Sequence, residues 1–176
     1  SEHFLLVGEC HNVESVMNKD ELESLCIKIR ECLDKWSADG TLETVDGSDT
    51  CNFPSGCCGF VTECLAVILY KMTGTVPNQV TAKCEKSHSN YNKLAANSHL
   101  RLELNGISID LTGDQFNDHC INIPPVFVST SPHPLSTKME TKSKPAYVIG
   151  LTKPLTGHDT AQLALIQRLR KELNLF

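Results

Sequence analysis

Residues 99–112 read HLRLELNGISIDLT, and this stretch decides which sheet the chain can form. Apolar and polar residues alternate on both sides of Asn105-Gly106, the dipeptide most typical of a two-residue β-hairpin turn. Because such a turn fixes the strand register, Leu104 is expected to face Ile107. One face of the predicted hairpin is then apolar and carries Leu100, Leu102, Leu104, Ile107, Ile109 and Leu111. The other face is polar and carries His99, Arg101, Glu103, Ser108, Asp110 and Thr112.

His99 and Asp110 are diagonal neighbours on the polar face of this hairpin. Their backbones are expected to lie roughly 7–8 Å apart, which lets long side chains meet in a hydrogen bond. A plainer interpretation is a solvent-exposed hairpin face on which Asp110 pairs with Arg101 directly opposite. The hairpin pattern alone favours neither interpretation.

Two segments before the hairpin predict helices. Residues 18–36 place apolar side chains at spacings of three and four, and Asn18 with Glu21 forms a capping-box pattern at the start. The segment that follows Gly56 and ends at Gly74 is apolar on nearly every side, which predicts a buried helix.

The other segments predict loops, a strand and a last helix. We expect a loop over 37–56, a mobile loop over 129–146, a strand over 147–152 and an amphipathic helix over 159–173, capped by Asp159 with Gln162.

Cys58 would lie in the first turn of the buried helix. Unpaired backbone N–H groups and the helix dipole favour an anion there, so they lower the pKa of a thiol and produce the nucleophilic thiolate. Such a nucleophile needs a base and a group that orients the base, and His99 with Asp110 can supply both. A cysteine in an apolar helix is also an ordinary core residue, so its position in the helix is weak support by itself.

Length and composition limit the class of protein. The 176 residues suffice for a single domain, 1–176, and the net charge of −5 argues against a nucleic-acid-binding surface. No apolar run approaches the roughly 20 residues of a membrane-spanning helix, and no secretory signal is visible. Nine cysteines, an odd number, favour a reducing compartment over a disulfide framework. We therefore expect a cytoplasmic protein, or one delivered into the reducing cytosol of another cell.

Three segments, in order, resemble a group of small bacterial proteins. The segments are FPSGCCG at 53–59, HLRLE at 99–103 and IDLTGDQF at 109–116. The corresponding motifs of the group are F-P-x-G-x-C-G, H-x-W-L-E and I-D-x-T-x-D-Q-F. The group is similar to the papain-like and transglutaminase-like thiol hydrolases. The resemblance implies an α+β fold with a papain-like core, in which a buried helix carrying the cysteine packs on an antiparallel sheet carrying the histidine and the aspartate.

The resemblance also implies roles for individual residues. Within a catalytic core over about 52–128, Cys58 would be the nucleophile, His99 the general base and acid, and Asp110 the carboxylate that orients His99. Asn52 lies six residues before Cys58, where papain-like enzymes have a glutamine that binds the oxyanion, so it is a candidate oxyanion donor; a turn residue before Phe53 is the alternative.

Other positions match the group's pattern less simply. Arg101 stands where the group usually has tryptophan, and Cys57 precedes Cys58, so the nucleophile could be shifted by one residue. Gln115 matches a motif position and is expected to shape the loop after the strand. Ser131-Pro132-His133 also fits the pattern, although His133 by itself is expected at the surface.

The expected function is that of a cysteine-dependent amide hydrolase, most simply a glutamine deamidase of the bacterial effector or toxin type that acts on a protein substrate. A cysteine peptidase or acyl-transfer enzyme with the same triad is an alternative. A further alternative is an inactive binding module, in which Arg101 holds Asp110 away from His99. No C-x-x-C pair or H-x-x-x-H spacing is present, so we expect no metal and no cofactor.

Overall fold

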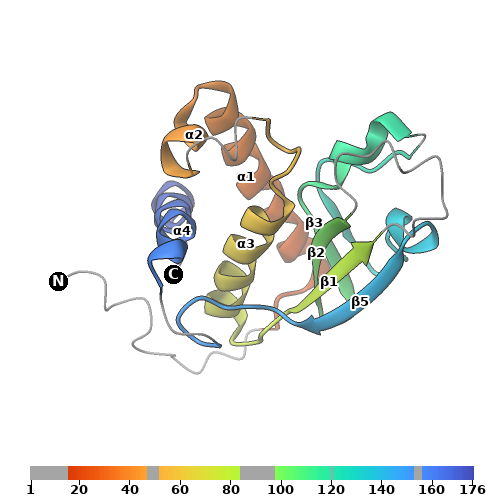
Figure 1. Ribbon diagram of the computed structural model, residues 1–176. Coiled ribbons are helices and arrows are strands. Elements are labelled where there is room, and N and C mark those ends of the chain that lie inside the picture. Colours follow the sequence, from red (N-terminus) through yellow and green to blue (C-terminus); the bar gives the residue numbers. More distant parts are fainter. Residues whose placement is uncertain (1–15, 47–51, 84–97, 120, 153–155) are drawn as a thin grey trace.

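The computed structural model describes residues 16–46, 52–83, 98–119, 121–152 and 156–176. Over these ranges the chain forms a mixed α+β structure with four α-helices and one five-stranded antiparallel sheet (Figure 1). The helices are α1 (Lys19–Ala38), α2 (Thr41–Asp46), α3 (Cys58–Thr73) and α4 (Thr160–Leu173). The strands lie in the order β4 (Phe127–Ser129), β3 (Ile107–Asp110), β2 (Ser98–Leu104), β1 (Asn78–Lys83) and β5 (Glu140–Pro145).

The hairpin predicted from residues 99–112 is confirmed as β2 and β3. Leu104 faces Ile107 and Leu102 faces Ile109, as the turn requires. Asn105 and Gly106 both have positive φ, 51° and 78°, which is the backbone of a type I′ turn. Leu102 and Ile109 are buried in the main hydrophobic core, so the apolar face of the hairpin points toward the helices.

The helix expected over 18–36 corresponds to α1. Asn18 and Glu21 form the capping box: Asn18 Oδ1 accepts from Glu21 N–H, and Glu21 Oε2 accepts from Asn18 N–H, each at 3.0 Å. The apolar stripe that the spacing predicts is buried and consists of Leu22, Leu25, Cys26, Ile29, Leu33 and Trp36.

The buried helix is α3, which packs on β2 on one side and on α4 on the other (Figure 1). It ends at Gly74, whose φ of 71° is the left-handed conformation of a helix C-cap. Thr62 Oγ1 donates a hydrogen bond to the Leu100 carbonyl on β2 at 3.2 Å. This contact holds the first turns of α3 against the start of the hairpin.

The polar face of the hairpin is buried as well. His99 is 0% exposed and Asp110 is 2% exposed, although each is polar. Chain segments between residues 113 and 139 lie over this face, and they form a small apolar core with β1 that consists of Ala82, Phe116, Ile121, Ile123, Leu135 and Met139. The solvent-exposed interpretation of the hairpin face is therefore wrong.

The expectation of a mobile loop over 129–146 is wrong too. The segment contains a 3₁₀ helix, η4 (Pro134–Thr137), and the edge strand β5, which pairs with β1 over its six residues. Every residue of β5 is exposed. Lysines are common on edge strands because their charge discourages pairing with a further strand, and this gives an edge strand the composition of a loop.

Two neighbouring expectations also fail. Residues 147–152 form no strand: Ile149 makes an isolated bridge, and a turn follows in which Leu151 and Thr152 both donate their N–H groups to the Val148 carbonyl. The loop expected over 37–56 contains α2, which is held by the fully buried Leu42. In both places tertiary packing outweighs the local composition.

The predicted cap of the last helix is also different in the structure. Asp159 makes no side-chain cap on α4; its carboxylate accepts from Thr156 at the start of the 3₁₀ helix η5 (Gly157–Asp159). Gln162 donates to Glu63 on α3. Among the described helices, none has the length and apolar character needed to cross a membrane.

Candidate active site

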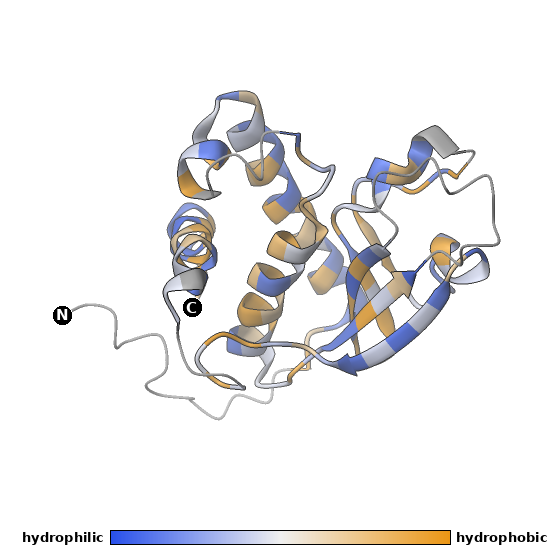
Figure 2. Ribbon diagram, viewed as in Figure 1, coloured by the Kyte–Doolittle hydropathy of each residue, from blue (hydrophilic) through white to orange (hydrophobic). Residues whose placement is uncertain are grey.

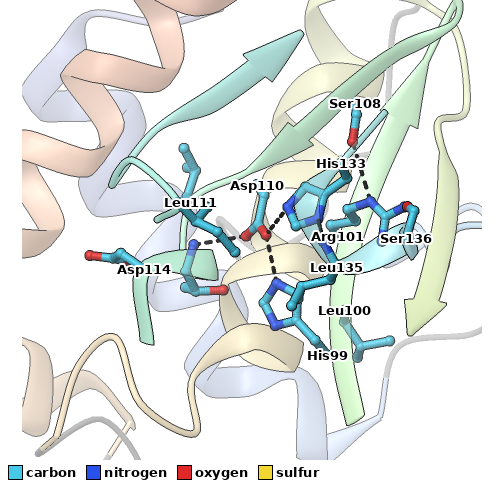
Figure 3. Close-up of polar contacts among 12 residues, drawn as sticks. His99, Leu100, Arg101, Ser108, Asp110, Leu111, Asp114, His133, Leu135 and Ser136 are labelled. Carbon is cyan, nitrogen blue, oxygen red and sulfur yellow. Dashed lines mark hydrogen bonds and ion pairs between the residues drawn. The ribbon is translucent and has the colours of Figure 1, made fainter. Parts of the chain in front are cut away.

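His99 on β2 and Asp110 on β3 form a direct hydrogen bond. Nε2 of His99 lies 2.7 Å from Oδ2 of Asp110, and both side chains are buried (Figure 3). The second carboxylate oxygen, Oδ1, accepts the backbone N–H of Thr112 at 2.9 Å. The hairpin therefore brings together the histidine and the aspartate that the diagonal pairing predicts.

Cys58 is the first residue of α3 and is half-buried. The His99 side chain and the backbone N–H groups of Leu100 and Gly59 act on this thiol as hydrogen-bonding groups that favour the thiolate. Burial favours the neutral thiol, but these hydrogen bonds and the charge of His99 outweigh it, so the pKa of Cys58 is lowered. His99 is thus hydrogen-bonded to Asp110, and it is also the side chain that favours the thiolate of Cys58.

The two ring nitrogens of His99 have different partners. Since Nε2 is bound to Asp110, Nδ1 is the nitrogen that remains for the thiol of Cys58. Burial favours the neutral imidazole, but the charge and hydrogen bond of Asp110, together with Cys58, raise the pKa of His99 to about 9. A lowered thiol pKa beside a raised imidazole pKa favours a thiolate–imidazolium pair near neutral pH.

Cys57 is placed differently from Cys58. It is almost fully buried, and its thiol points to the carbonyl of Ser55, with 3.5 Å between Sγ and O. Of the two adjacent cysteines, Cys58 is the more exposed, and His99 lowers its pKa.

His133 is a second histidine on Asp110, and the expectation that it lies at the surface is wrong. It is 2% exposed, and its Nε2 lies 2.9 Å from Asp110 Oδ2 (Figure 3). Its Nδ1 accepts the N–H of Leu135 at 3.2 Å, so the ring proton is on Nε2 and points to Asp110. Burial, followed by the charges of Arg101 and His99, lowers the pKa of His133, and the ring is a neutral donor.

Gln115 also belongs to this site. From its motif position alone, Gln115 was expected only to shape the loop after the strand. Its Nε2 donates to the Thr112 carbonyl at 2.8 Å and lies 3.5 Å from Nδ1 of His99. Its Oε1 accepts the N–H of Gly56 at 3.3 Å. The carboxamide of Gln115 therefore connects the loop after β3 to the turn before Cys58.

Asn52 makes a different set of contacts. Its side chain is exposed, and its carbonyl accepts the N–H of Ser55 at 2.8 Å in the turn before α3. Among the described residues, no hydrogen bond joins the Asn52 side chain to Cys58 or His99. The side-chain amide that lies beside His99 is that of Gln115.

Arg101 points away from the hydrogen bond between His99 and Asp110. Its guanidinium donates to Ser108 Oγ at 3.2 Å and to Ser136 Oγ at 2.9 Å. The idea that Arg101 holds Asp110 away from His99 is therefore wrong, because Asp110 remains 2.7 Å from His99. Within the described part of the chain, the buried NH1 atom of Arg101 has no hydrogen-bond partner, and burial lowers the pKa of this side chain.

Arg30 on α1 holds the loop after β3 in place, and no sequence motif pointed to it. Its guanidinium binds both carboxylate oxygens of Asp114 at 2.8 and 2.9 Å and donates to the Leu111 carbonyl at 2.8 Å. It also lies 4.8 Å above the ring of Phe53 in the turn before α3. Arg30 therefore contacts both segments that Gln115 connects.

Gly113 has no side chain, and the carboxylate of Asp110 occupies the space where a Cβ atom would lie. A Cβ atom at this position would lie 2.5 Å from Asp110 Oδ2 and 2.9 Å from Cγ2 of Ile123. Because both distances are shorter than van der Waals contact, any other residue at 113 would displace the carboxylate.

Comparison of the chain with family models, curated proteins and solved structures gave no match in any of the three.

Proposed function

We propose that this protein is a cysteine-dependent amide hydrolase in which Cys58 is the nucleophile. His99 is the general base and acid, and Asp110 orients it. The observation that carries the proposal is the hydrogen bond from His99 Nε2 to the buried Asp110 carboxylate at 2.7 Å, on a histidine whose charge lowers the pKa of the Cys58 thiol. A nucleophile, a base and a group that orients the base make up the chemical requirement for acyl transfer through a thioester.

The mechanism follows from the two ring nitrogens of His99. In the thiolate–imidazolium pair His99 already holds the thiol proton at Nδ1, and the thiolate of Cys58 attacks the carbonyl carbon of the amide. Backbone N–H groups at the N-terminus of α3 stabilise the oxyanion, because the helix dipole favours negative charge there. When the tetrahedral intermediate collapses, the C–N bond breaks and the leaving nitrogen receives its proton from His99.

The second half of the reaction uses His99 as a base. It removes a proton from water, the hydroxide attacks the thioester, and the C–S bond breaks to return the thiol. A glutamine side chain would leave as glutamate, with release of ammonia. Asp110 stays ionised throughout, because the charge and hydrogen bonds of His99 and His133 outweigh its burial and hold the pKa of this carboxyl far below its usual value.

The depth of the site supports a side-chain amide as the substrate. His99 is fully buried and Cys58 is half-buried, so the reacting carbonyl must approach the sulfur from one side. A glutamine carries its carboxamide at the end of a slim, flexible arm, whereas a peptide bond brings main chain on both sides. We therefore favour deamidation of a protein glutamine over cleavage of a chain; the resemblance to papain-like and transglutaminase-like thiol hydrolases is compatible with either reaction.

The deciding experiment is the pH profile of Cys58 alkylation by iodoacetamide, mapped by mass spectrometry because the chain contains nine cysteines. We expect Cys58 to react selectively below pH 7, and the His99→Ala variant to lose this reactivity. Reaction at Cys57, or reaction of Cys58 at the rate of an ordinary thiol, would contradict the proposal and favour an inactive binding module. The substrate is then sought by mass, since deamidation adds about one mass unit and proteolysis cuts the chain.

A further inference from the structure

Arg101 on β2 is a buried cation that the proposed mechanism does not use. Figure 2 shows hydrophilic residues within the strands of the hairpin, and Arg101, which is 6% exposed, is one of those that the fold buries. Its guanidinium donates to two neutral hydroxyls, Ser108 Oγ at 3.2 Å and Ser136 Oγ at 2.9 Å (Figure 3). Because a guanidinium stays charged in proteins, Arg101 places a fixed positive charge inside the polar face of the hairpin.

Arg101 holds one end of a short turn whose other end lies on Asp110. His133 is the N-cap of η4, and its carbonyl accepts the N–H of Ser136 at 2.8 Å, so both residues belong to this turn. The ring of His133 lies 2.9 Å from Asp110, and the hydroxyl of Ser136 lies 2.9 Å from Arg101. Between them, Leu135 is fully buried in the small apolar core. The 3₁₀ helix η4 is therefore fastened to the hairpin at both ends.

The two attachment points are neighbours across the hairpin. The register pairs Leu102 with Ile109. One step further along the two strands, Arg101 lies opposite Asp110. Residues that lie directly opposite each other project to the same face of a sheet, so both side chains point to the segment that covers the polar face. A change in how Arg101 holds η4 therefore acts on the neighbouring contact of η4 with Asp110.

The charge of Arg101 also acts on the ring of His133. Three titratable or charged groups face this ring: Asp110 on β3, and Arg101 and His99 on β2. Burial, and then the charges of Arg101 and His99, outweigh Asp110 and lower the pKa of His133. The neutral ring donates from Nε2, since its Nδ1 accepts the N–H of Leu135. Of the two histidines on Asp110, His99 is then the one that carries the imidazolium charge.

We propose that Arg101 is a positioning residue for the triad: it holds η4 on the hairpin, and so keeps the ring of His133 on the carboxylate of Asp110. This inference rests on the proposed function, because that carboxylate orients His99. Arg101 acts through Ser136 and η4 rather than on the reacting atoms. When its contact with Ser136 is lost, the hold of η4 on Asp110 weakens, and the carboxylate gains freedom to turn from His99.

The first test removes the contact and keeps the charge. Ser136→Ala deletes the hydroxyl that Arg101 binds, at a half-buried position that accommodates alanine. We expect iodoacetamide to alkylate Cys58 about 10-fold more slowly at pH 6, which corresponds to the loss of one hydrogen bond to a charged group. Thr137→Ala is the matched control, because it removes an exposed hydroxyl of η4 that donates to Pro134. It should leave the rate unchanged, and equal rates in the two variants would overturn the inference.

The pH profile distinguishes positioning from general damage. At a pH of about 10 an ordinary thiol is largely ionised without a partner, so Ser136→Ala and the unaltered protein should alkylate at the same rate there. A difference that persists at this pH would indicate altered access to Cys58 and would overturn the inference.

A double variant tests whether Arg101 acts through His133. His133→Ala alone removes the ring from Asp110, so adding Ser136→Ala should slow the alkylation at pH 6 no further. Two effects that multiply would show that Ser136 acts by another route, which contradicts the proposal.

The conservative variant gives an independent check. Arg101→Lys keeps a positive charge and a donor for Ser136, whereas Arg101→Met keeps the bulk alone, so Cys58 should react faster at pH 6 in the lysine variant. Equal rates in these two variants would show that only the bulk matters. If Cys58 of the unaltered protein reacts selectively below pH 7 but Ser136→Ala and Arg101→Met change nothing, only the role of Arg101 fails. If Cys58 of the unaltered protein reacts as an ordinary thiol, the proposed function fails, and the role of Arg101 fails with it.

Discussion

His99 and His133 donate hydrogen bonds from Nε2 to the same oxygen, Asp110 Oδ2, at 2.7 and 2.9 Å. The N–H of Thr112 occupies the other oxygen. Three donors thus fix the direction of one fully buried carboxylate. Because the base of the proposed triad depends on that direction, the groups around Asp110 supply sharp tests of the site.

His133→Ala removes one donor from a buried carboxylate and leaves the N–H of Leu135 without its acceptor. We expect a loss of about 1–3 kcal/mol in the free energy of unfolding, which is typical of an unsatisfied buried group. The alkylation rate of Cys58 at pH 6 should fall together with it, because Asp110 gains freedom to turn from His99. His133→Gln keeps an amide donor and should restore part of the rate. An alkylation profile unchanged in His133→Ala would show that His133 does not position the triad.

Gly113→Ala places a methyl group 2.5 Å from Asp110 Oδ2. The carboxylate must move, so we expect Cys58 to lose its selective reactivity below pH 7. The matched control is Gly59→Ala, where the new Cβ would lie 3.6 Å from Leu100, an ordinary contact. In that helix position alanine should stabilise the protein by up to about 1 kcal/mol. Equal alkylation profiles for the two variants, measured on folded protein, would contradict the steric argument.

Gln115→Ala tests whether the carboxamide beside Nδ1 of His99 contributes to turnover. If its Nε2 helps to stabilise the oxyanion, kcat on a glutamine substrate should fall about 10²–10³-fold, while the alkylation rate of Cys58 changes little. Asn52→Ala is the matched variant, because its side chain is exposed and should leave kcat nearly unchanged. A large loss of kcat in Asn52→Ala with little change in Gln115→Ala would instead indicate that Asn52 binds the oxyanion.

The pH dependence of stability tests the state of His99. Its folded pKa of about 9 lies above the value of about 6.5 in an unfolded chain, so its stabilisation is complete below pH 6.5 and is lost as the pH rises toward 9. The lowered pKa of Cys58 acts in the opposite direction, so Cys58→Ala isolates the histidine. In this variant Asp110 still raises the pKa of His99, although the contribution of Cys58 is lost, so the melting temperature should fall as the pH rises above 6.5. In the double variant Cys58→Ala with His99→Gln, this dependence of the melting temperature on pH should disappear. If it remains, a group other than His99 causes it.

The parts of the site that the sequence predicted are those with local patterns. Asn105-Gly106 and its alternating flanks are enough to place His99 diagonal to Asp110, because turn chemistry and the two-residue period of a strand act over a few residues. The apolar helix after Gly56 likewise predicts Cys58 at a helix N-terminus. His133 has no such pattern. It reaches Asp110 because the chain, after β4 has paired with β3, returns over the polar face of the hairpin in η4, and only the resemblance in Ser131-Pro132-His133 pointed to it.

By itself, therefore, the sequence determined the capped helix α1, the buried helix α3 and the hairpin with its register. Only the tertiary structure decided what covers the polar face of that hairpin, that Arg30 joins α1 to the loop carrying Gln115, and that a lysine-rich segment is an edge strand rather than a loop. The reason is physical. Caps, turns and periodicity are set by neighbours in the chain, whereas the burial of a polar group depends on contacts between segments far apart in sequence, and these form only when the whole core packs.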